Sequence, residues 1–250
     1  MAGRVRVGTS GWSYRSWVGG FYPDPTPASR LLARYGERLG AVEAHATFRR
    51  FPSPTTVAGW AAATPPGFRF APKAQASITH RRDLEGLEER VARFLAGLGP
   101  LGPRLGPVLY ALPHRQVDLA RLDALLSALP GPGAGPAAVL ELAPAWHTPE
   151  VQARLRDHGV GLVVVDVDGG DDPAPGAPGH LPGNVRYVRL RRRAYGHQAL
   201  ARWADRLGGW AADGHETYAF VRHDDDGRAP RYALWLQRRL DPPEPPPGHP

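Results

Sequence analysis

The sequence predicts an α/β protein built as a single (β/α)8, or TIM, barrel that covers residues 1–240. Eight short apolar segments look like buried parallel strands, and seven of them are followed by a segment with helical periodicity. The units recur about every 25 to 30 residues, the spacing of a βα unit. A doubly wound open sheet is the alternative, but the glycine-rich nucleotide turn that usually accompanies it does not occur in the sequence.

In the first half of the chain, each predicted strand is followed by a helix whose start carries a capping residue. Ser, Thr and Asp are favoured there because their side chains accept hydrogen bonds from the first backbone N–H groups, and Pro fits the next position. The predicted strands cover residues 4–7, 41–46, 68–73 and 108–112. The predicted helices begin at Thr26, Ser53, Asp83 and Asp118.

The second half repeats this pattern with one exception. Residues 167–184 are too rich in Gly and Pro for a helix, so a loop is expected to replace the helix after strand six. The Pro-rich tail, 241–250, is expected to be disordered. The predicted strands cover residues 137–142, 160–166, 185–190 and 217–221. The predicted helices begin at Thr148, run through Leu200 to Leu207, and cover 232–240.

The composition favours a cytoplasmic protein with anionic partners. The net charge is +7, which favours an anionic small molecule or nucleic acid as ligand. Gly, Pro and Arg are abundant, however, and a GC-rich genome gives the same bias, so the charge alone is weak evidence. The absence of cysteine excludes disulfides and thiolate metal sites. The chain starts without an apolar signal-like segment and contains no long apolar run, so no membrane association is expected.

Polar and charged residues gather at the carboxyl ends of the predicted strands, where TIM-barrel enzymes carry their active sites. Seven of the eight strand ends carry them, and charges inside a barrel opening must pair with one another or bind a ligand. For any single residue, a position on a solvated rim is the alternative. In chain order they are Thr9, Ser10, Glu43, His45, Lys73, Glu141, Asp166, Arg189, Arg191, Arg222 and His223.

Lys73 stands out because it is the only lysine among 31 basic residues. It follows Pro72, which ends the third strand because it has no N–H to donate. An ammonium group is a compact charge whose pKa falls on burial, and it can bind phosphate or act as an acid or nucleophile. Lys73 is therefore predicted to be functional; a surface lysine that survived by chance is the alternative.

The arginines of the late strands lie where TIM barrels commonly bind phosphate, in the loops after strands seven and eight. Guanidinium groups match phosphate oxygens, although a solvated basic rim would have the same composition. The Gly/Ser-rich loop 8–14 can offer backbone N–H groups to an anion, and its aromatic residues either line a pocket or cover the core. The predicted substrate-binding residues are Ser10, Trp12, His45, Arg189, Arg191 and Arg222.

The remaining strand-end residues are candidates for catalysis. Glu43 and His80 are the predicted acid and base, and Lys73 would stabilise developing negative charge. No cofactor is predicted. A divalent metal is possible, but the potential ligands have no diagnostic spacing, and we expect folding to need no metal. The predicted catalytic residues are Glu43, Lys73, His80, Glu141 and Asp166.

Several motifs in the first half are distinctive. They are GTSGWSY at 8–14, FYP at 21–23, VEAHATFRRFP at 42–52, FRFAPK…ITH at 68–80 and LGPVLYALP at 105–113. Together they resemble the domain of unknown function 72 family, also called YecE-like, and the resemblance extends over about residues 5–240. It implies a TIM barrel, in agreement with the strand pattern. The family's activity is not established, so the resemblance implies no reaction.

The chain departs from the family pattern at the predicted site. The family tends to have Glu-x-Arg where this chain has Glu141-Leu142-Ala143, and His where it has Arg191. A small Ala143 leaves space beside Glu141, and an unpaired buried carboxylate is costly. We therefore expect Arg191 to replace the missing arginine and to pair with Glu141, or with an anion shared with Arg189.

Three functions fit these observations. The first is an enzyme that acts on a phosphate-bearing substrate by acid/base chemistry at the barrel opening. The second is metal-assisted phosphodiester hydrolysis of nucleic acid. The third is a catalytically degenerate barrel that binds an anionic ligand or partner. Glu43, Lys73 and Glu141 favour an enzyme, and the altered positions 143 and 191 favour a binding protein. The shared position at strand ends predicts that five of these residues converge in one cavity at the carboxyl end of the barrel: Glu43, Lys73, Glu141, Asp166 and Arg189.

Overall fold

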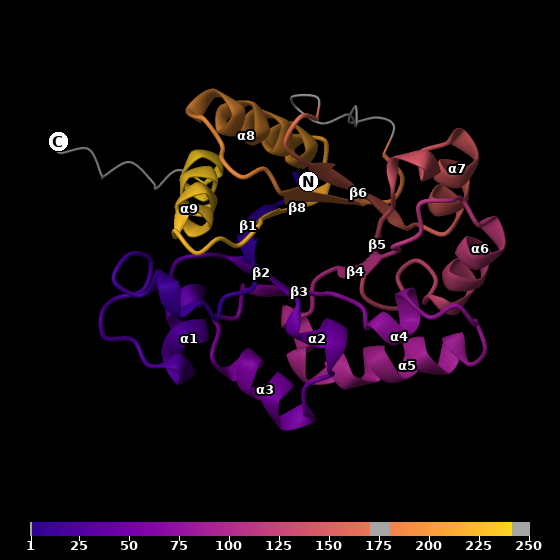
Figure 1. Ribbon diagram of the computed structural model, residues 1–250, viewed down its shortest axis with the longest axis horizontal. Coiled ribbons are helices and arrows are strands. Elements are labelled where there is room, and N and C mark those ends of the chain that lie inside the picture. Colours follow the sequence, from indigo (N-terminus) through magenta and orange to yellow (C-terminus); the bar gives the residue numbers. More distant parts are fainter. Residues whose placement is uncertain (1, 171–180, 242–250) are drawn as a thin grey trace.

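The structure, a computed structural model, describes residues 2–170 and 181–241 and shows eight parallel strands in a nearly closed barrel surrounded by helices (Figure 1). The predicted fold is therefore confirmed. Around the barrel the order is β3-β2-β1-β8-β7-β6-β5-β4. The predicted tail and the middle of the predicted loop after strand six lie outside the described residues. The strands are β1 (Val5–Ser10), β2 (Ala41–Ala44), β3 (Arg69–Pro72), β4 (Val108–Ala111), β5 (Ala138–Glu141), β6 (Gly161–Asp166), β7 (Val185–Leu190) and β8 (Glu216–Val221).

The helices form the outer layer, and in residues 2–170 and 181–241 none is long and apolar enough to span a bilayer. Ser53, Asp118 and Thr148 cap their helices as predicted, each accepting a hydrogen bond from a backbone N–H of the first turn. The helices are α1 (Leu31–Gly36), α2 (Ala46–Arg49), α3 (Pro54–Ala62), α4 (Ala76–Thr79), α5 (Leu87–Leu98), α6 (Leu119–Ala128), α7 (Pro149–Asp157), α8 (His197–Ala212) and α9 (Arg228–Leu240).

Two predicted helix starts are wrong. The Thr26 hydroxyl donates to the carbonyl of Pro23 instead of capping a helix, and α1 begins only after a short 3-10 turn. Asp83 pairs with Arg81, and α5 begins after Gly86, whose φ of +62° favours glycine. In both cases a local hydrogen bond competes with the helix for the predicted capping side chain.

The barrel closes between β3 and β4 through isolated contacts instead of a continuous ladder. Gly106 donates its N–H to the carbonyl of Phe70 at 2.7 Å, and Ala74 donates to Leu109 at 2.8 Å. Lys73 and Leu109 form a single bridge between these two segments. Since Pro72 has no N–H, Lys73 lies at the seam of the barrel, at its carboxyl end.

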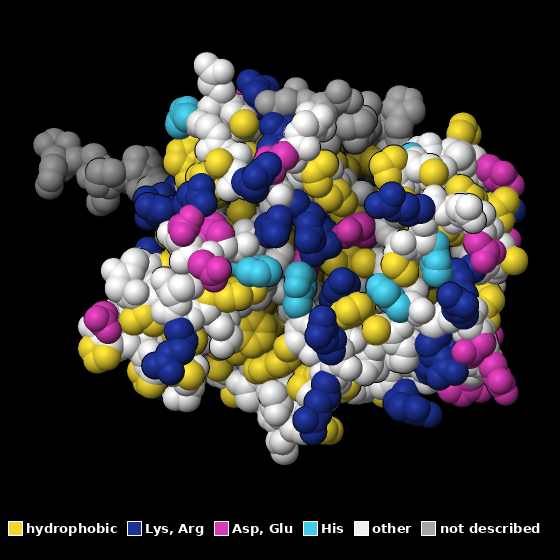
Figure 2. All heavy atoms as spheres, in the orientation of Figure 1, with side chains coloured by type: hydrophobic (Ala, Val, Ile, Leu, Met, Phe, Trp, Pro, Cys, Tyr) yellow, Lys and Arg dark blue, Asp and Glu magenta, His cyan; other side chains and the backbone are white. Residues whose placement is uncertain are grey.

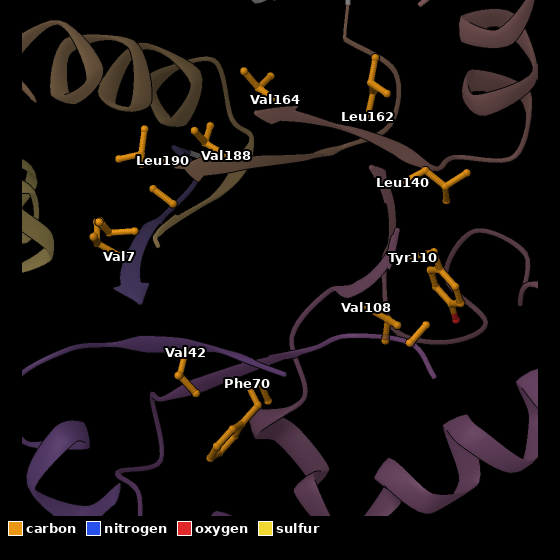
Figure 3. Close-up of a cluster of buried hydrophobic side chains, with 14 of the residues drawn as sticks. Val7, Val42, Phe70, Val108, Tyr110, Leu140, Leu162, Val164, Val188 and Leu190 are labelled. Carbon is orange, nitrogen blue, oxygen red and sulfur yellow. The ribbon is translucent and has the colours of Figure 1, made fainter. Parts of the chain in front are cut away.

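Strand alternation divides the apolar residues into an inner and an outer core. Figure 3 shows residues of the outer core, which are distributed around the ring of strands and pack against the helices. The inner core fills the barrel. Two residues further along a strand, a side chain faces inward again, so each strand's inner face continues to the opening at the carboxyl end. The inner core consists of Ala41, Ala71, Leu109, Val139, Val163, Tyr187, Tyr218 and Phe220.

Candidate functional site

The opening at the carboxyl ends of the strands, here called the mouth, is built around the Glu43 carboxylate. Glu43 follows Ala41 on the inner face of β2 and is completely buried. Its Oε1 accepts hydrogen bonds from Ser10 Oγ at 3.0 Å, from Arg189 Nη2 at 2.7 Å and from His45 Nε2. The Tyr187 hydroxyl donates to Oε2 at 2.7 Å. Both carboxylate oxygens are therefore engaged.

These contacts keep Glu43 ionised. Burial alone would raise the pKa of the Glu43 carboxyl, but the Arg189 charge and the hydrogen bonds from His45 and Tyr187 hold it well below its usual range. Burial also raises the pKa of the Tyr187 hydroxyl, which stays a donor. A buried carboxylate with a lowered pKa and hydrogen bonds to both oxygens is suited to orienting its neighbours. This geometry does not favour the predicted acid/base role for Glu43.

Arg189 joins the two glutamates of the mouth. Its side chain is 3% exposed, and its guanidinium pairs with Glu43 through Nη2 and with Glu141 through Nη1. Burial lowers the pKa of Arg189, but the two carboxylates outweigh this effect and raise it. Arg189 is therefore committed to internal ion pairs, although it is predicted to hold a substrate.

The expected pairing of Arg191 with Glu141 is wrong, because Glu141 pairs with Arg189. Arg189 lies two residues after Tyr187 on the inner face of β7. Arg191 lies two residues further toward the opening, so Arg189 is deeper in the barrel and contacts both glutamates. Among the described residues, Arg191 makes no ion pair. Glu141 remains 25% exposed, so one side of its carboxylate faces the mouth.

Lys73 and Arg191 are the two half-buried cations beside these pairs. Burial and the nearby Arg189 charge lower the pKa of both side chains. The Lys73 Nζ lies 4.1 Å from the centroid of the Phe48 ring on α2, and within the described part of the chain it makes no ion pair. Both cations also interact electrostatically with Glu43 and Glu141, so they belong to the same site.

Asp166 does not join the mouth. Val163 belongs to the inner core, so Asp166, three residues later on β6, faces outward. Its buried carboxylate accepts hydrogen bonds from Arg192 Nε at 2.7 Å and from Trp203 Nε1 of α8 at 2.9 Å. Convergence is therefore found for Glu43, Glu141, Arg189 and Lys73, whereas Asp166 anchors α8 to the barrel.

The loop after β8, one of the two loops predicted to bind phosphate, presents a carboxylate at the start of α9. Asp224 accepts hydrogen bonds from the backbone N–H groups of Arg228 at 2.9 Å and Ala229 at 2.6 Å. Its carboxylate therefore occupies the N-terminus of α9. Arg222 is exposed and lies in a cavity of ≈ 410 Å³ together with Asp224 and two further aspartates. Three further arginines, Arg192, Arg193 and Arg228, line the same cavity, so its charges are mixed, and the Asp224 carboxylate already occupies the N-terminus of α9.

The loop after β1 has fewer free donors than the sequence suggests. Gly11 donates its N–H to the carbonyl of Glu43 at 2.9 Å, and Thr9 donates to the Tyr35 hydroxyl at 2.8 Å. These two N–H groups are therefore not free to bind an anion, and the contact of the loop 8–14 with an anion stays a prediction. Trp12 packs edge-on against Trp60, at 5.2 Å between ring centroids, and also lines a small pocket with His45. Trp12 therefore both covers the core and lines a pocket, the two alternatives predicted for the aromatic residues of this loop.

Histidines lie around the two cations. His45 is about one-third exposed and held by Glu43, and the His223 ring stacks on Tyr14 at 4.9 Å. His80 is exposed, bonds to Thr79 Oγ1 through Nδ1 at 2.7 Å and packs edge-on against Phe48. Burial and the nearby Lys73 lower the pKa of His80. Figure 2 shows several histidines among Lys and Arg side chains across the middle of this face.

In the described part of the chain, no group of three or more His, Asp or Glu side chains is arranged to hold a metal ion. Tyr187, which donates to Glu43, was not among the site residues predicted from the sequence. The strand pattern could have indicated it, because Tyr187 lies two residues before Arg189 on the same strand and its side chain therefore lies on the same face.

Comparisons with known proteins agree with the fold. A family model described as "Protein of unknown function DUF72" matches residues 6–249. The UPF0759 protein YecE of Escherichia coli K12 is 24% identical over 268 residues, which cover 96% of this chain and 94% of that protein. A solved DUF72 family protein of Thermotoga maritima MSB8 has a TM-score of 0.76 at 26% identity and covers 95% of this chain and 99% of its own.

A second solved DUF72 family protein, from Enterococcus faecalis V583, has a TM-score of 0.72 at 19% identity. The alignment covers 96% of this chain and 98% of that one. At this identity the likeness supports the fold alone. Because the family model spans nearly the whole chain, this protein belongs to the DUF72 family of TIM barrels.

Proposed function

We propose that the mouth is the active site of an enzyme whose phosphate-bearing substrate is bound by Lys73 and Arg191 and exchanges protons with His45. One observation carries this proposal. Glu43 and Glu141 both pair with Arg189, whereas Lys73 and Arg191, both half-buried, pair with no carboxylate in residues 2–170 and 181–241. Half-buried cations that form no direct ion pair favour the binding of an anion.

The charge balance supports an anionic ligand. Glu43 and Glu141 contribute two negative charges, and Arg189, Lys73 and Arg191 contribute three positive charges. The sum is +1 before any ligand binds, and the site is partly desolvated, which strengthens its electrostatic interactions. A phosphate group suits a site that contains both a compact ammonium and a planar guanidinium, because it offers several acceptor oxygens.

His45 is the best-placed group for proton transfer. Its Nε2 is fixed by the ionised Glu43, which holds the ring in one orientation. A carboxylate that orients an imidazole is a common arrangement in acid/base catalysis, since the other ring nitrogen can then accept a proton. No residue in the described part of the chain makes a hydrogen bond to Nδ1, and the ring, about one-third exposed, lines a small pocket with Trp12 and Tyr14. His80, beyond Phe48, is the second candidate.

A binding protein without catalysis is the competing function. The full engagement of Glu43 and Arg189 in internal pairs favours it, because two predicted functional groups then serve the scaffold. A binding protein would retain phosphate without changing it. Release of product from a panel of phosphate monoesters would support the enzyme, and binding without release would support the binding protein.

The test of the anion site is calorimetric titration with inorganic phosphate and pyrophosphate. The double variant K73M/R191M is expected to bind at least about tenfold more weakly than the wild type, because both cations contact the anion. The control is R156M/R239M, which removes the same two charges from exposed positions on α7 and α9. If both double variants lose affinity equally, net charge explains the binding and the proposal is wrong.

A further inference from the structure

A second cavity adjoins the anion site. It has a volume of ≈ 610 Å³ and lies at the carboxyl ends of β4, β5 and β6. Most of its wall is apolar, and Glu141 forms part of it. Arg115 and His147, both exposed, are its other charged or titratable side chains. The apolar wall includes Leu112, Leu142, Ala143, Pro144, Ala145 and Val165.

The two sites share Glu141. One carboxylate oxygen of Glu141 pairs with Arg189, and the side chain also borders the apolar cavity. Lys73 and Arg191 interact electrostatically with the same carboxylate. A ligand of moderate size can therefore place its phosphate on the two cations and extend past Glu141 into the cavity.

The sequence explains why this side of the mouth is apolar. On β4 the inner face continues from Leu109 to Ala111, and on β6 it continues from Val163 to Val165, so neither strand sends a charge into the mouth. Beyond β6, Val167 is 46% exposed, and it is one of two large apolar side chains exposed in the described residues. Exposed apolar surface beside a charged site is a common feature of ligand pockets.

We propose that this cavity binds the apolar part, an aromatic ring or short hydrocarbon chain, of the substrate whose phosphate contacts Lys73 and Arg191. This rests on the proposed function and narrows its substrate class to aryl or alkyl phosphates. Sugar hydroxyl groups that lie against Leu112, Leu142 and Val165 would lose water, and these three side chains offer no hydrogen bond in return, which is unfavourable. An apolar group gains from the same transfer.

The experiment compares calorimetric titrations with methyl phosphate, phenyl phosphate and a hexose phosphate. The wild type is expected to bind phenyl phosphate about tenfold more tightly than methyl phosphate, and the hexose phosphate no more tightly than methyl phosphate. The A143F variant fills the cavity, so it should lose the additional affinity for phenyl phosphate. Its affinity for methyl phosphate should remain that of the wild type. The control is A120F, which makes the same substitution on the exposed face of α6 and should still bind phenyl phosphate more tightly than methyl phosphate.

Because Ala143 is partly buried, A145F serves as a second blocking variant at an exposed position of the cavity wall. Equal affinities for methyl and phenyl phosphate would overturn this inference and leave the anion site standing. A gain that survives in both blocking variants would also overturn it. If no phosphate probe binds the wild type, the proposed function fails, and the inference fails with it.

Discussion

Replacing Arg189 by methionine is expected to destabilise the fold by about 3–5 kcal/mol, since removal of one partner of a buried ion pair leaves an uncompensated charge. Glu43 and Glu141 would keep their places in the barrel, but both would lose the arginine that pairs with them. Urea unfolding at neutral pH measures the effect. R189K keeps the charge but loses the planar guanidinium that joins two carboxylates. Its free energy of unfolding should therefore lie between those of the wild type and R189M.

The pH dependence of this loss has a defined sign. In the wild type the folded-state pKa of Glu43 is lowered, so its contribution to stability is present above the unfolded pKa of about 4.3 and is lost as the pH falls below it. In R189M burial would raise that pKa instead, so the penalty should grow as the pH rises above about 4.3. The stability gap between wild type and R189M should therefore be smaller at acid pH than at neutral pH.

A double variant separates the charge effect from packing. E43Q/R189M removes the buried charge together with its partner and should recover part of the stability lost in R189M. If E43Q makes R189M worse, or if R189M unfolds at the same urea concentration as the wild type, the Glu43–Arg189 pair is not what holds the inner barrel together.

The second large effect is expected for turnover. H45Q should lower kcat for a phosphate monoester by about a hundredfold or more, because proton transfer by a positioned side chain contributes about that much. Phosphate affinity should not change, since Lys73 and Arg191 remain. The measurement is steady-state kinetics beside a phosphate titration of the same protein.

The matched control is H158Q, which makes the same substitution at an exposed histidine at the end of α7. It should leave both kcat and phosphate affinity unchanged. If the kcat of H45Q lies within a few-fold of the wild-type value, another group transfers the proton, and His80 is the first alternative.

The sequence predicts the barrel and much of its mouth for one physical reason. Parallel strands of a barrel end on the same side, so residues far apart in the chain, such as Glu43, Glu141 and Arg189, meet there. Local patterns predict this well, because strand ends and helix caps depend on a few neighbouring residues. The caps at Thr26 and Asp83 fail where another local hydrogen bond competes.

The internal pairing of the mouth could not be predicted in the same way. Strand β6 is apolar on both faces, so its pattern does not reveal that Asp166 faces α8. Arg189 and Arg191 share a face, and the choice between them as partner of Glu141 depends on depth along the barrel, which spacing does not give. The apolar cavity arises from three strand ends together, and no single motif encodes it.

The most direct test of the anion site is a crystal of the protein soaked in tungstate, whose anomalous scattering marks a phosphate-like ion. We expect a peak within hydrogen-bonding distance of both Lys73 Nζ and the Arg191 guanidinium, and we expect this peak to be absent in crystals of K73M/R191M. A peak at the start of α9 beside Arg222, with none between Lys73 and Arg191, would contradict it.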